Sequence, residues 1–381
     1  MHVLLRCPWV LLVTVMCNCS SLSRVTEVHP SAILACSKDN LTITTTWPTS
    51  LAADDRFRST LTPTADILVG CYLIVIEIMA VLLNGSIICL SVWKRKTLKV
   101  TDCYVVYLAV SDLGHPLMAY PMIIASSFRH AWVFEDIGCM WNGFTGFFFG
   151  VNSMTTLAVM SFSRLIVMTQ SNFARNHATA IAASLLVFSL LFALFWATCP
   201  LLGWGAYGPE PYKTSCTLVW DKPDKSFVTA AFIGCLAIPA GIMFYSYFRI
   251  LCMTIRTRHK RLKWAPRSNE MRVWERKEMR LLKITFIMCA SFMLCWTPYA
   301  VVAMMKAYYS HMHLSASLSA FPALAAKTSH VIDPIIYCGL NKNFSRIIPE
   351  VFKKSQEIDR EQLTTSVPLK TIAKVTFDQK E

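Results

Sequence analysis

Charged residues are scarce in this chain of 381 residues. Asp, Glu, Lys and Arg make up 16% of it, whereas a typical soluble domain contains about 25%. Hydrophobic residues account for 54% and gather in repeated long runs. This shortage of charge argues against a string of soluble domains, which the length alone would allow. No internal repeat is visible either. The composition therefore predicts a membrane protein.

Acidic residues are the rarer kind of charge. The chain has 23 Asp and Glu against 37 Lys and Arg, a formal net charge of +14. A basic chain often binds nucleic acid, but here basic residues cluster in two short connections between apolar runs. Such loops stay in the cytosol, so we expect an extracellular N-terminus, a cytoplasmic C-terminus and no nucleic-acid partner. The clusters are Lys94, Arg95, Lys96 and Lys99, and Arg256, Arg258, Lys260, Arg261, Lys263 and Arg267.

A disulfide framework is not expected, although the chain has 15 cysteines. Most of them lie inside apolar runs, where a thiol behaves as a small hydrophobic group. Cys139 and Cys216 are the exception, because both are expected outside the membrane.

Seven apolar runs exceed the roughly 20 residues that cross a hydrocarbon core of about 30 Å. They predict an all-α membrane protein with a seven-helix bundle over residues 66–340. Prolines interrupt the last four runs; proline kinks a helix and opens room between neighbours. The runs cover about 67–93, 100–126, 137–169, 178–202, 227–255 and 281–306, with a seventh that ends near Leu340, and the prolines are Pro200, Pro239, Pro298 and Pro334.

The flanking segments differ in character from the runs. Residues 1–20 look like a cleaved signal peptide, with an uncleaved extension as the alternative. Residues 21–65 are expected to form an extracellular tail with a glycosylation site at Asn40. Residues 341–354 place apolar side chains at helical spacing and predict an amphipathic helix on the inner leaflet. Residues 355–381 are expected to form a polar cytoplasmic tail.

Lys327 is the most informative residue of the seventh run. It has several apolar residues on each side, and a lysine at the centre of a membrane helix costs about 2.5–3.5 kcal/mol on insertion scales. The alternative is a lysine near a helix end that extends its amine to the headgroups. Its depth within the run favours a functional amine.

Several motifs together resemble the rhodopsin-like G-protein-coupled receptors over residues 66–354. The resemblance rests on Asn84, Asp112 in Leu108-Ala-Val-Ser-Asp112, Cys139, Cys295-Trp296-Thr-Pro298-Tyr299 and Asp333-Pro334-Ile-Ile-Tyr337. Lys327 narrows it to the opsins, and the loop from Gly203 to Cys216 is most similar to the neuropsin-related group.

The resemblance implies a binding chemistry for Lys327. In opsins this lysine holds retinal as a Schiff base, and a desolvated pocket suits it because an amine attacks an aldehyde only when uncharged. A protonated linkage then needs a nearby anion. One family position for that anion holds the neutral Asn142, and the other, six residues before Cys216, holds Glu210. We expect Glu210 to be the counterion; the alternative is an ordinary loop acid with an unprotonated, ultraviolet-absorbing linkage.

Further roles follow from the same resemblance. Trp296, Tyr299, Phe147 and Gly150 are expected to line the retinal pocket, although aromatic residues in apolar helices are usually packing alone. Cys139 and Cys216 are expected to form a disulfide.

Two histidines lie near these positions along the chain. His115 lies one turn after Asp112. It could tune the colour of the pigment or titrate, or it could be a structural histidine. His330 lies one turn from Lys327 on the same face, where it could tune the linkage or bond between helices.

Activation roles are implied for Arg164, Asp333, Tyr337 and Tyr247. The chain departs from the family at Ser163, where an acidic residue normally restrains the following arginine. This departure predicts either raised basal signalling or weak coupling. Asp333 replaces the usual asparagine.

Asn84, Asp112 and Asp333 are expected near the bundle centre, where the receptor class holds water or a sodium ion. No resident metal is expected.

The leading interpretation is a light-sensing receptor, not an enzyme, for which we expect a bistable pigment that is sensitive to short wavelengths. Its expected partners are the lipid bilayer, retinal and a heterotrimeric G protein, for which we favour Gi although the loops do not discriminate Gi from Gq or Gs. Arrestin is a further candidate partner. One alternative is a retinal photoisomerase or carrier with weak or no coupling, and another is a receptor for a diffusible ligand.

Overall fold

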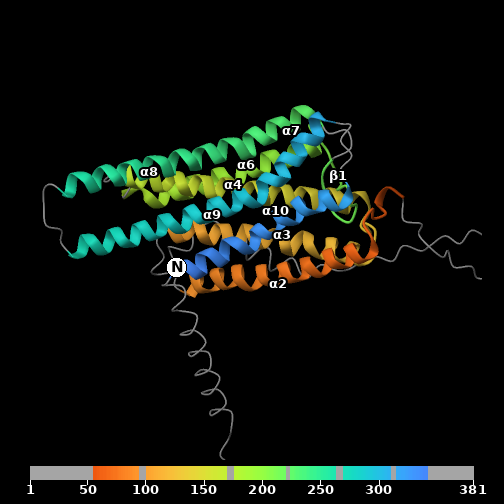
Figure 1. Ribbon diagram of the computed structural model, residues 1–381, viewed down its shortest axis with the longest axis horizontal. Coiled ribbons are helices and arrows are strands. Elements are labelled where there is room, and N and C mark those ends of the chain that lie inside the picture. Colours follow the sequence, from red (N-terminus) through yellow and green to blue (C-terminus); the bar gives the residue numbers. More distant parts are fainter. Residues whose placement is uncertain are drawn as a thin grey trace, which may run out of the picture.

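A computed structural model describes residues 55–93, 100–169, 176–219, 224–262, 269–309 and 315–341. In this part of the chain, long helices run lengthwise beside one another and form a single bundle (Figure 1). The all-α, seven-helix prediction is confirmed. Several predictions concern residues that the structure does not describe. They are the signal peptide, the glycosylation site at Asn40, the amphipathic helix after residue 341 and the cytoplasmic tail over 355–381.

The helix bounds lie close to the apolar runs. The largest difference is the sixth helix, which begins 12 residues earlier than its run because polar residues continue it at its N-terminal end. The helical elements are η3 (Asp55–Phe57), α2 (Pro63–Trp93), α3 (Val100–Phe128), α4 (Glu135–Thr169), α6 (Ala178–Thr198), η4 (Cys199–Leu202), α7 (Lys225–Ala231), η5 (Phe232–Ala237), α8 (Ile238–Leu262), α9 (Asn269–Tyr308) and α10 (Ala316–Leu340).

Five helical segments of the described chain are long and apolar enough to cross a membrane by length and composition alone. Helices α3 and α10 are not among them. Both carry buried polar side chains, including Asp112 and His115 on α3 and Lys327, His330 and Asp333 on α10. These buried polar side chains lower the hydropathy of α3 and α10 and direct polar groups into the bundle interior.

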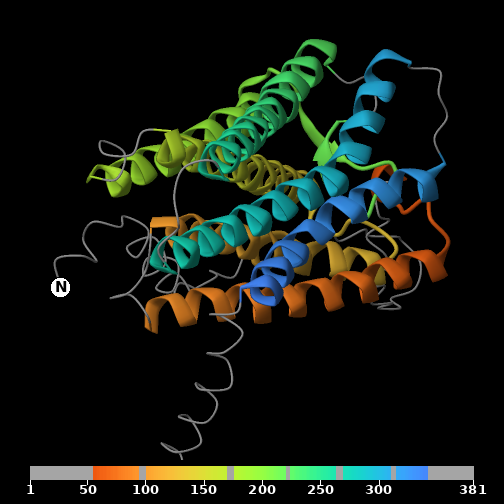
Figure 2. The same ribbon diagram turned by 60° about the vertical axis from the view of Figure 1, so that its left-hand side comes forward.

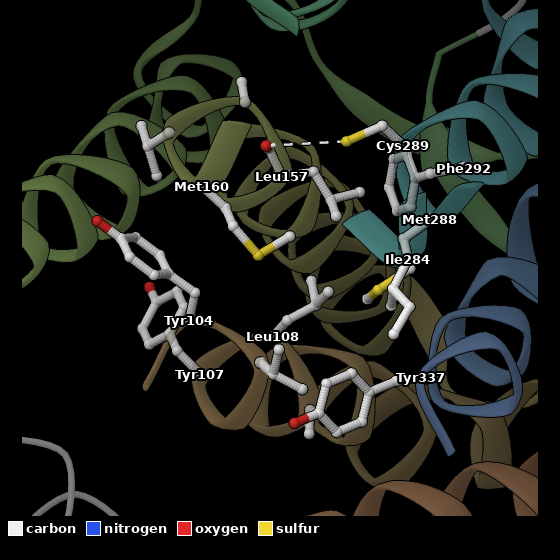
Figure 3. Packing of buried hydrophobic residues seen from close by; sticks show 14 of the residues in the cluster. Tyr104, Tyr107, Leu108, Leu157, Met160, Ile284, Met288, Cys289, Phe292 and Tyr337 are labelled. Carbon is white, nitrogen blue, oxygen red and sulfur yellow. Dashed lines mark hydrogen bonds between the residues drawn. The ribbon is translucent and has the colours of Figure 1, made fainter. Parts of the chain in front are cut away.

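The centre of the bundle is a close-packed apolar cluster between α3, α4, α9 and α10 (Figure 3). Leu157 on α4 is fully buried. Its carbonyl oxygen accepts a hydrogen bond from Sγ of Cys289 on α9, at 3.9 Å. Tyr337 of α10 packs against the same cluster near Leu108. Because close van der Waals packing holds helices together in a membrane, this cluster fixes the helices that carry the polar site.

A short hairpin covers one end of the bundle (Figure 2). Its strands, β1 (Tyr207–Pro209) and β2 (Cys216–Leu218), pair antiparallel with Pro209 opposite Cys216, and both contact α4. The expected disulfide between Cys139 and Cys216 is present, with an S–S distance of 2.06 Å. The hairpin is thus attached covalently to the first turn of α4.

The segment ahead of α2 holds the hairpin from the other side. The Ser59 hydroxyl donates to the Tyr212 carbonyl oxygen at 3.2 Å, and Thr60 donates to the carbonyl oxygen of Pro211 at 2.8 Å. Ser59 also donates to the buried carboxylate of Asp66 at 2.8 Å. These contacts fix the backbone of the two residues that follow Glu210 in the turn.

Candidate ligand-binding site

A cavity opens between the hairpin and the helices α3, α4, α7, α9 and α10. Apolar and aromatic side chains make up most of its wall, among them Phe147, Phe292 and Trp296. Lys327, His115 and Glu210 add polar groups to the same wall. Such a largely apolar cavity with a few convergent polar groups is typical of a small-molecule site.

Lys327 and Glu210 form an ion pair inside this cavity. Nζ of Lys327 lies 3.5 Å from Oε1 of Glu210, and the two residues are 8% and 2% exposed. Tyr120 anchors the lysine backbone by donating to its carbonyl oxygen at 3.0 Å. A buried charge is stable only when it is paired and hydrogen-bonded, so each of these two side chains requires the other.

The hairpin turn determines where Glu210 lies. The Glu210 N–H donates to the Ser215 carbonyl oxygen at 2.8 Å, and the Ser215 hydroxyl donates to Oε1 of Glu210 at 3.4 Å. Tyr212, fully buried in the same turn, has its pKa raised well above the ordinary value, first by burial and then by the Glu210 charge. The tyrosine therefore stays neutral beside the carboxylate.

Asn142 joins the hairpin to the bundle. Its Oδ1 accepts from the Cys216 N–H at 3.1 Å, and its Nδ2 donates to the Ala119 carbonyl oxygen at 3.2 Å. Both ends of the amide are thus used in positioning β2 against α3. This structural role was not predicted, because nothing in the sequence indicates which backbone groups a buried asparagine will meet.

The four residues expected to line the pocket all face the cavity. Gly150 makes room for the indole of Trp296, because a Cβ at residue 150 would lie 2.3 Å from Cη2 of that ring. Trp296 donates from Nε1 to the Ser329 hydroxyl at 3.1 Å. Phe147 lies on the α4 side, with its ring 6.1 Å from that of Phe227.

Tyr299 connects the cavity wall to the hairpin. Its hydroxyl and that of Thr217 on β2 are 2.7 Å apart and share a hydrogen bond. The contribution of Thr217 was not predicted either, since a threonine in a loop has no distinguishing sequence signal. Helix α9 and the hairpin are therefore coupled directly at the cavity.

Two histidines complete the polar side of the site. Nδ1 of His115 lies 3.0 Å from Nε2 of His330, and Nδ1 of His330 lies 3.4 Å from Oδ1 of Asp112. Asn84 donates from Nδ2 to the His330 carbonyl oxygen at 2.9 Å. His330 thus lies between Asn84 and Asp112, two of the residues expected around a water or sodium site.

The residues with expected activation roles lie apart from the cavity wall. Tyr337 donates to Oδ1 of Asp102 at 3.4 Å, and the Tyr247 hydroxyl lies 3.7 Å from Sγ of Cys289. Arg164 is 8% exposed and Asp333 is 2% exposed. None of these four residues lines the cavity that contains Lys327.

The chain matches the family described as 7 transmembrane receptor (rhodopsin family) over residues 83–337. It is 34% identical to Opsin-5 of Homo sapiens over 307 residues, which span 78% of this chain and 85% of that protein. It is 32% identical to a rhodopsin described as G0-coupled from Mizuhopecten yessoensis over 296 residues, 74% of this chain and 72% of that one.

A solved structure shows the same fold. The crystal structure of squid rhodopsin superposes with a TM-score of 0.69 at 26% sequence identity, and the match covers 81% of this chain and 94% of that one.

Replacing Gly150 with alanine tests the close approach of Trp296. Gly150→Ala places a methyl group where the indole now lies, so we expect the ring to move and the melting temperature of the purified apoprotein to fall by several degrees. Gly85→Ala is the matched control, because a Cβ there meets nothing within 4 Å and alanine favours helices over glycine by about 1 kcal/mol. Equal melting temperatures for the two variants would contradict the packing described.

Proposed function

From the premise that this chain belongs to the rhodopsin family of seven-transmembrane receptors, and within it to the opsins, we propose that it holds retinal on Lys327 and signals to a G protein. Membership makes it a multi-pass membrane protein and a light-sensing receptor. The observation that carries the finer proposal is the buried ion pair, with Nζ of Lys327 3.5 Å from Oε1 of Glu210.

The residues of the cavity fit retinal. An aldehyde on an apolar polyene needs one amine at the end of an apolar channel, and Lys327 and the rings of Phe147, Trp296 and Tyr299 supply these features. When bound, retinal would supply light absorption and a change of shape on isomerisation. Lys306 also lines the cavity, but Lys327 is the amine that lies beside a carboxylate.

Glu210 is proposed as the counterion of the linkage. Of the described residues that line the cavity, it is the single carboxylate, and Asn142 is neutral with both ends of its amide already used. A positive charge on the Lys327 nitrogen in this buried site is favoured by the adjacent anion. The alternative, an unprotonated linkage that absorbs in the ultraviolet, is an outcome of the test below.

We propose further that the pigment is bistable and sensitive to short wavelengths. The support is the resemblance to opsins whose anion lies in the loop and not on the third helix. Here the loop acid is held by the disulfide and by Asn142, so both the bundle and the hairpin would retain the ligand after illumination.

The proposed orientation places the N-terminus outside and the basic connections inside. Helix α9 contains Pro298 two residues after Trp296, and a proline weakens the helix where it occurs. A change at the cavity could therefore move the inner half of α9 and open the face near Arg164 and Tyr247 to a G protein. Gi remains the class we favour, with arrestin as a further candidate partner.

A second candidate function is a retinal photoisomerase or carrier. Ser163 favours it, because a serine cannot form the ion pair through which an acidic residue normally restrains the neighbouring arginine. The same substitution is also compatible with a receptor of higher basal activity. Signalling measurements on the illuminated pigment separate the two functions.

Glu210→Gln tests the counterion. The amide keeps the size of the side chain but removes its charge. We therefore expect the variant to absorb at shorter wavelength than wild type, or its linkage to lose the proton at a lower pH. The expected difference in pH is at least about one unit, equivalent to about 1.4 kcal/mol. Spectra of reconstituted pigment across pH measure this shift. Glu135→Gln on the exposed start of α4 is the control. An unchanged pH-dependent spectrum in Glu210→Gln would remove the assignment.

Light-dependent nucleotide exchange tests the receptor function. We expect illuminated wild-type pigment to accelerate exchange on a Gi protein severalfold over the dark state, because the inner face opens after the cavity changes. Lys327→Ala, which has no amine to hold the ligand, should show no light-dependent increase. A pigment that forms and bleaches or switches normally, yet never stimulates exchange on Gi, Gq or Gs, would favour the photoisomerase.

A further inference from the structure

Two buried histidines and one aspartate form a continuous row beside the ligand cavity. His115 is 6% exposed, and His330 and Asp112 are 0% exposed. Nδ1 of His115 lies 3.0 Å from Nε2 of His330, whose Nδ1 lies 3.4 Å from Oδ1 of Asp112. The Ser153 hydroxyl donates to the same carboxylate oxygen at 2.8 Å, which anchors the inner end of the row.

The carboxylate determines where the protons of this row lie. An ionised carboxylate only accepts hydrogen bonds, so Nδ1 of His330 must donate to Asp112. In a neutral imidazole the second nitrogen then accepts, and the hydrogen between the two rings belongs to Nδ1 of His115. Nε2 of His115 is left with a lone pair and no proton.

This unprotonated nitrogen lies beside Gly146, in the wall of the cavity. A Cβ at Gly146 would lie 3.1 Å from Nε2 of His115, and both residues line the cavity wall. Lys327 lines the same cavity. The absence of a side chain at Gly146 therefore leaves a basic nitrogen open to the space in which a ligand on Lys327 would lie.

The charges around the row could compensate one additional proton on it. Asp112 contributes a negative charge whose Oδ2 has no hydrogen-bond partner among the described residues, so an imidazolium at the other end would be compensated within the row. Glu210 is the competing acceptor, on the other side of Lys327. The titratable groups around the row are Tyr72 and Glu77 on α2, Asp112 and Tyr120 on α3, Lys327 and Asp333 on α10, and Glu210 in the hairpin.

Resting on the proposed attachment of retinal to Lys327, we propose that Nε2 of His115 is the internal acceptor of the linkage proton, held in the accepting tautomer by His330 and Asp112. After illumination the N–H bond at the Lys327 nitrogen breaks and its electron pair stays on that nitrogen. An N–H bond forms at Nε2 of His115. The linkage becomes neutral, and the new imidazolium is stabilised through His330 by the Asp112 carboxylate.

The tautomer is tested in apoprotein, without retinal. Nitrogen NMR of 15N-histidine-labelled protein in lipid nanodiscs should show one histidine protonated at Nδ1 and bare at Nε2, a signal lost in His115→Phe and altered in Asp112→Asn. The exposed His177 gives the matched control, because His177→Gln should leave this signal unchanged. A neutral His115 that carries its proton on Nε2 would overturn the proposal.

The transfer itself is tested on the pigment by light-minus-dark infrared spectroscopy with 15N-histidine. Wild type and His177→Gln should gain imidazolium bands as the linkage loses its proton, and His115→Phe should lack these bands and lose the proton at least about tenfold more slowly. His115→Gln, closer in polarity, provides the same comparison if the phenylalanine variant fails to fold.

Two infrared outcomes would contradict the transfer to His115. A protonated-carboxyl band that disappears in Glu210→Gln, without histidine bands, would assign the proton to Glu210. A linkage that is already unprotonated in the dark would contradict it as well. If wild type forms no pigment, the proposed function fails, while the apoprotein spectrum still decides the tautomer.

Discussion

The buried ion pair of Lys327 and Glu210 is the constraint on which the rest of the structure depends. An unpaired charge in a bundle interior costs several kcal/mol, and these two side chains are each less than one-tenth exposed. The lysine comes from the last helix and the glutamate from a hairpin 117 residues earlier. The fold must therefore hold two distant parts of the chain within a few ångström of each other.

Three attachments hold the hairpin in this position. The disulfide fixes Cys216 to the first turn of α4, Asn142 binds the backbone of the same residue, and Ser59 and Thr60 bind the turn from the side of the first helix. Two of the attachments come from α4 and the third from the segment ahead of α2, so the position of the carboxylate depends on both parts of the chain. Arg164, Tyr247 and Tyr337 do not line the cavity that these attachments border.

The helices and the burial of Lys327 within the seventh one could be predicted from the sequence, and the disulfide from the resemblance to the opsins. Long apolar runs need no tertiary information, and a lysine within such a run is unusual enough to stand out. Glu210 was predicted from its spacing to Cys216 in a loop that resembles an opsin loop, not from chemistry. The pairing of His115 with His330 could not be predicted, because it depends on the rotation of α3 relative to α10. The contacts of Asn142, Ser215 and Thr217 depend likewise on how the hairpin docks.

Mapping of the covalent adduct tests the central claim most directly. The purified protein would be incubated with 11-cis or all-trans retinal, treated with borohydride to make the bond permanent, digested and examined by mass spectrometry. The account predicts one retinyl group, on the peptide that contains Lys327. An adduct on Lys306, the other amine of the cavity wall, or no adduct with either isomer would contradict it.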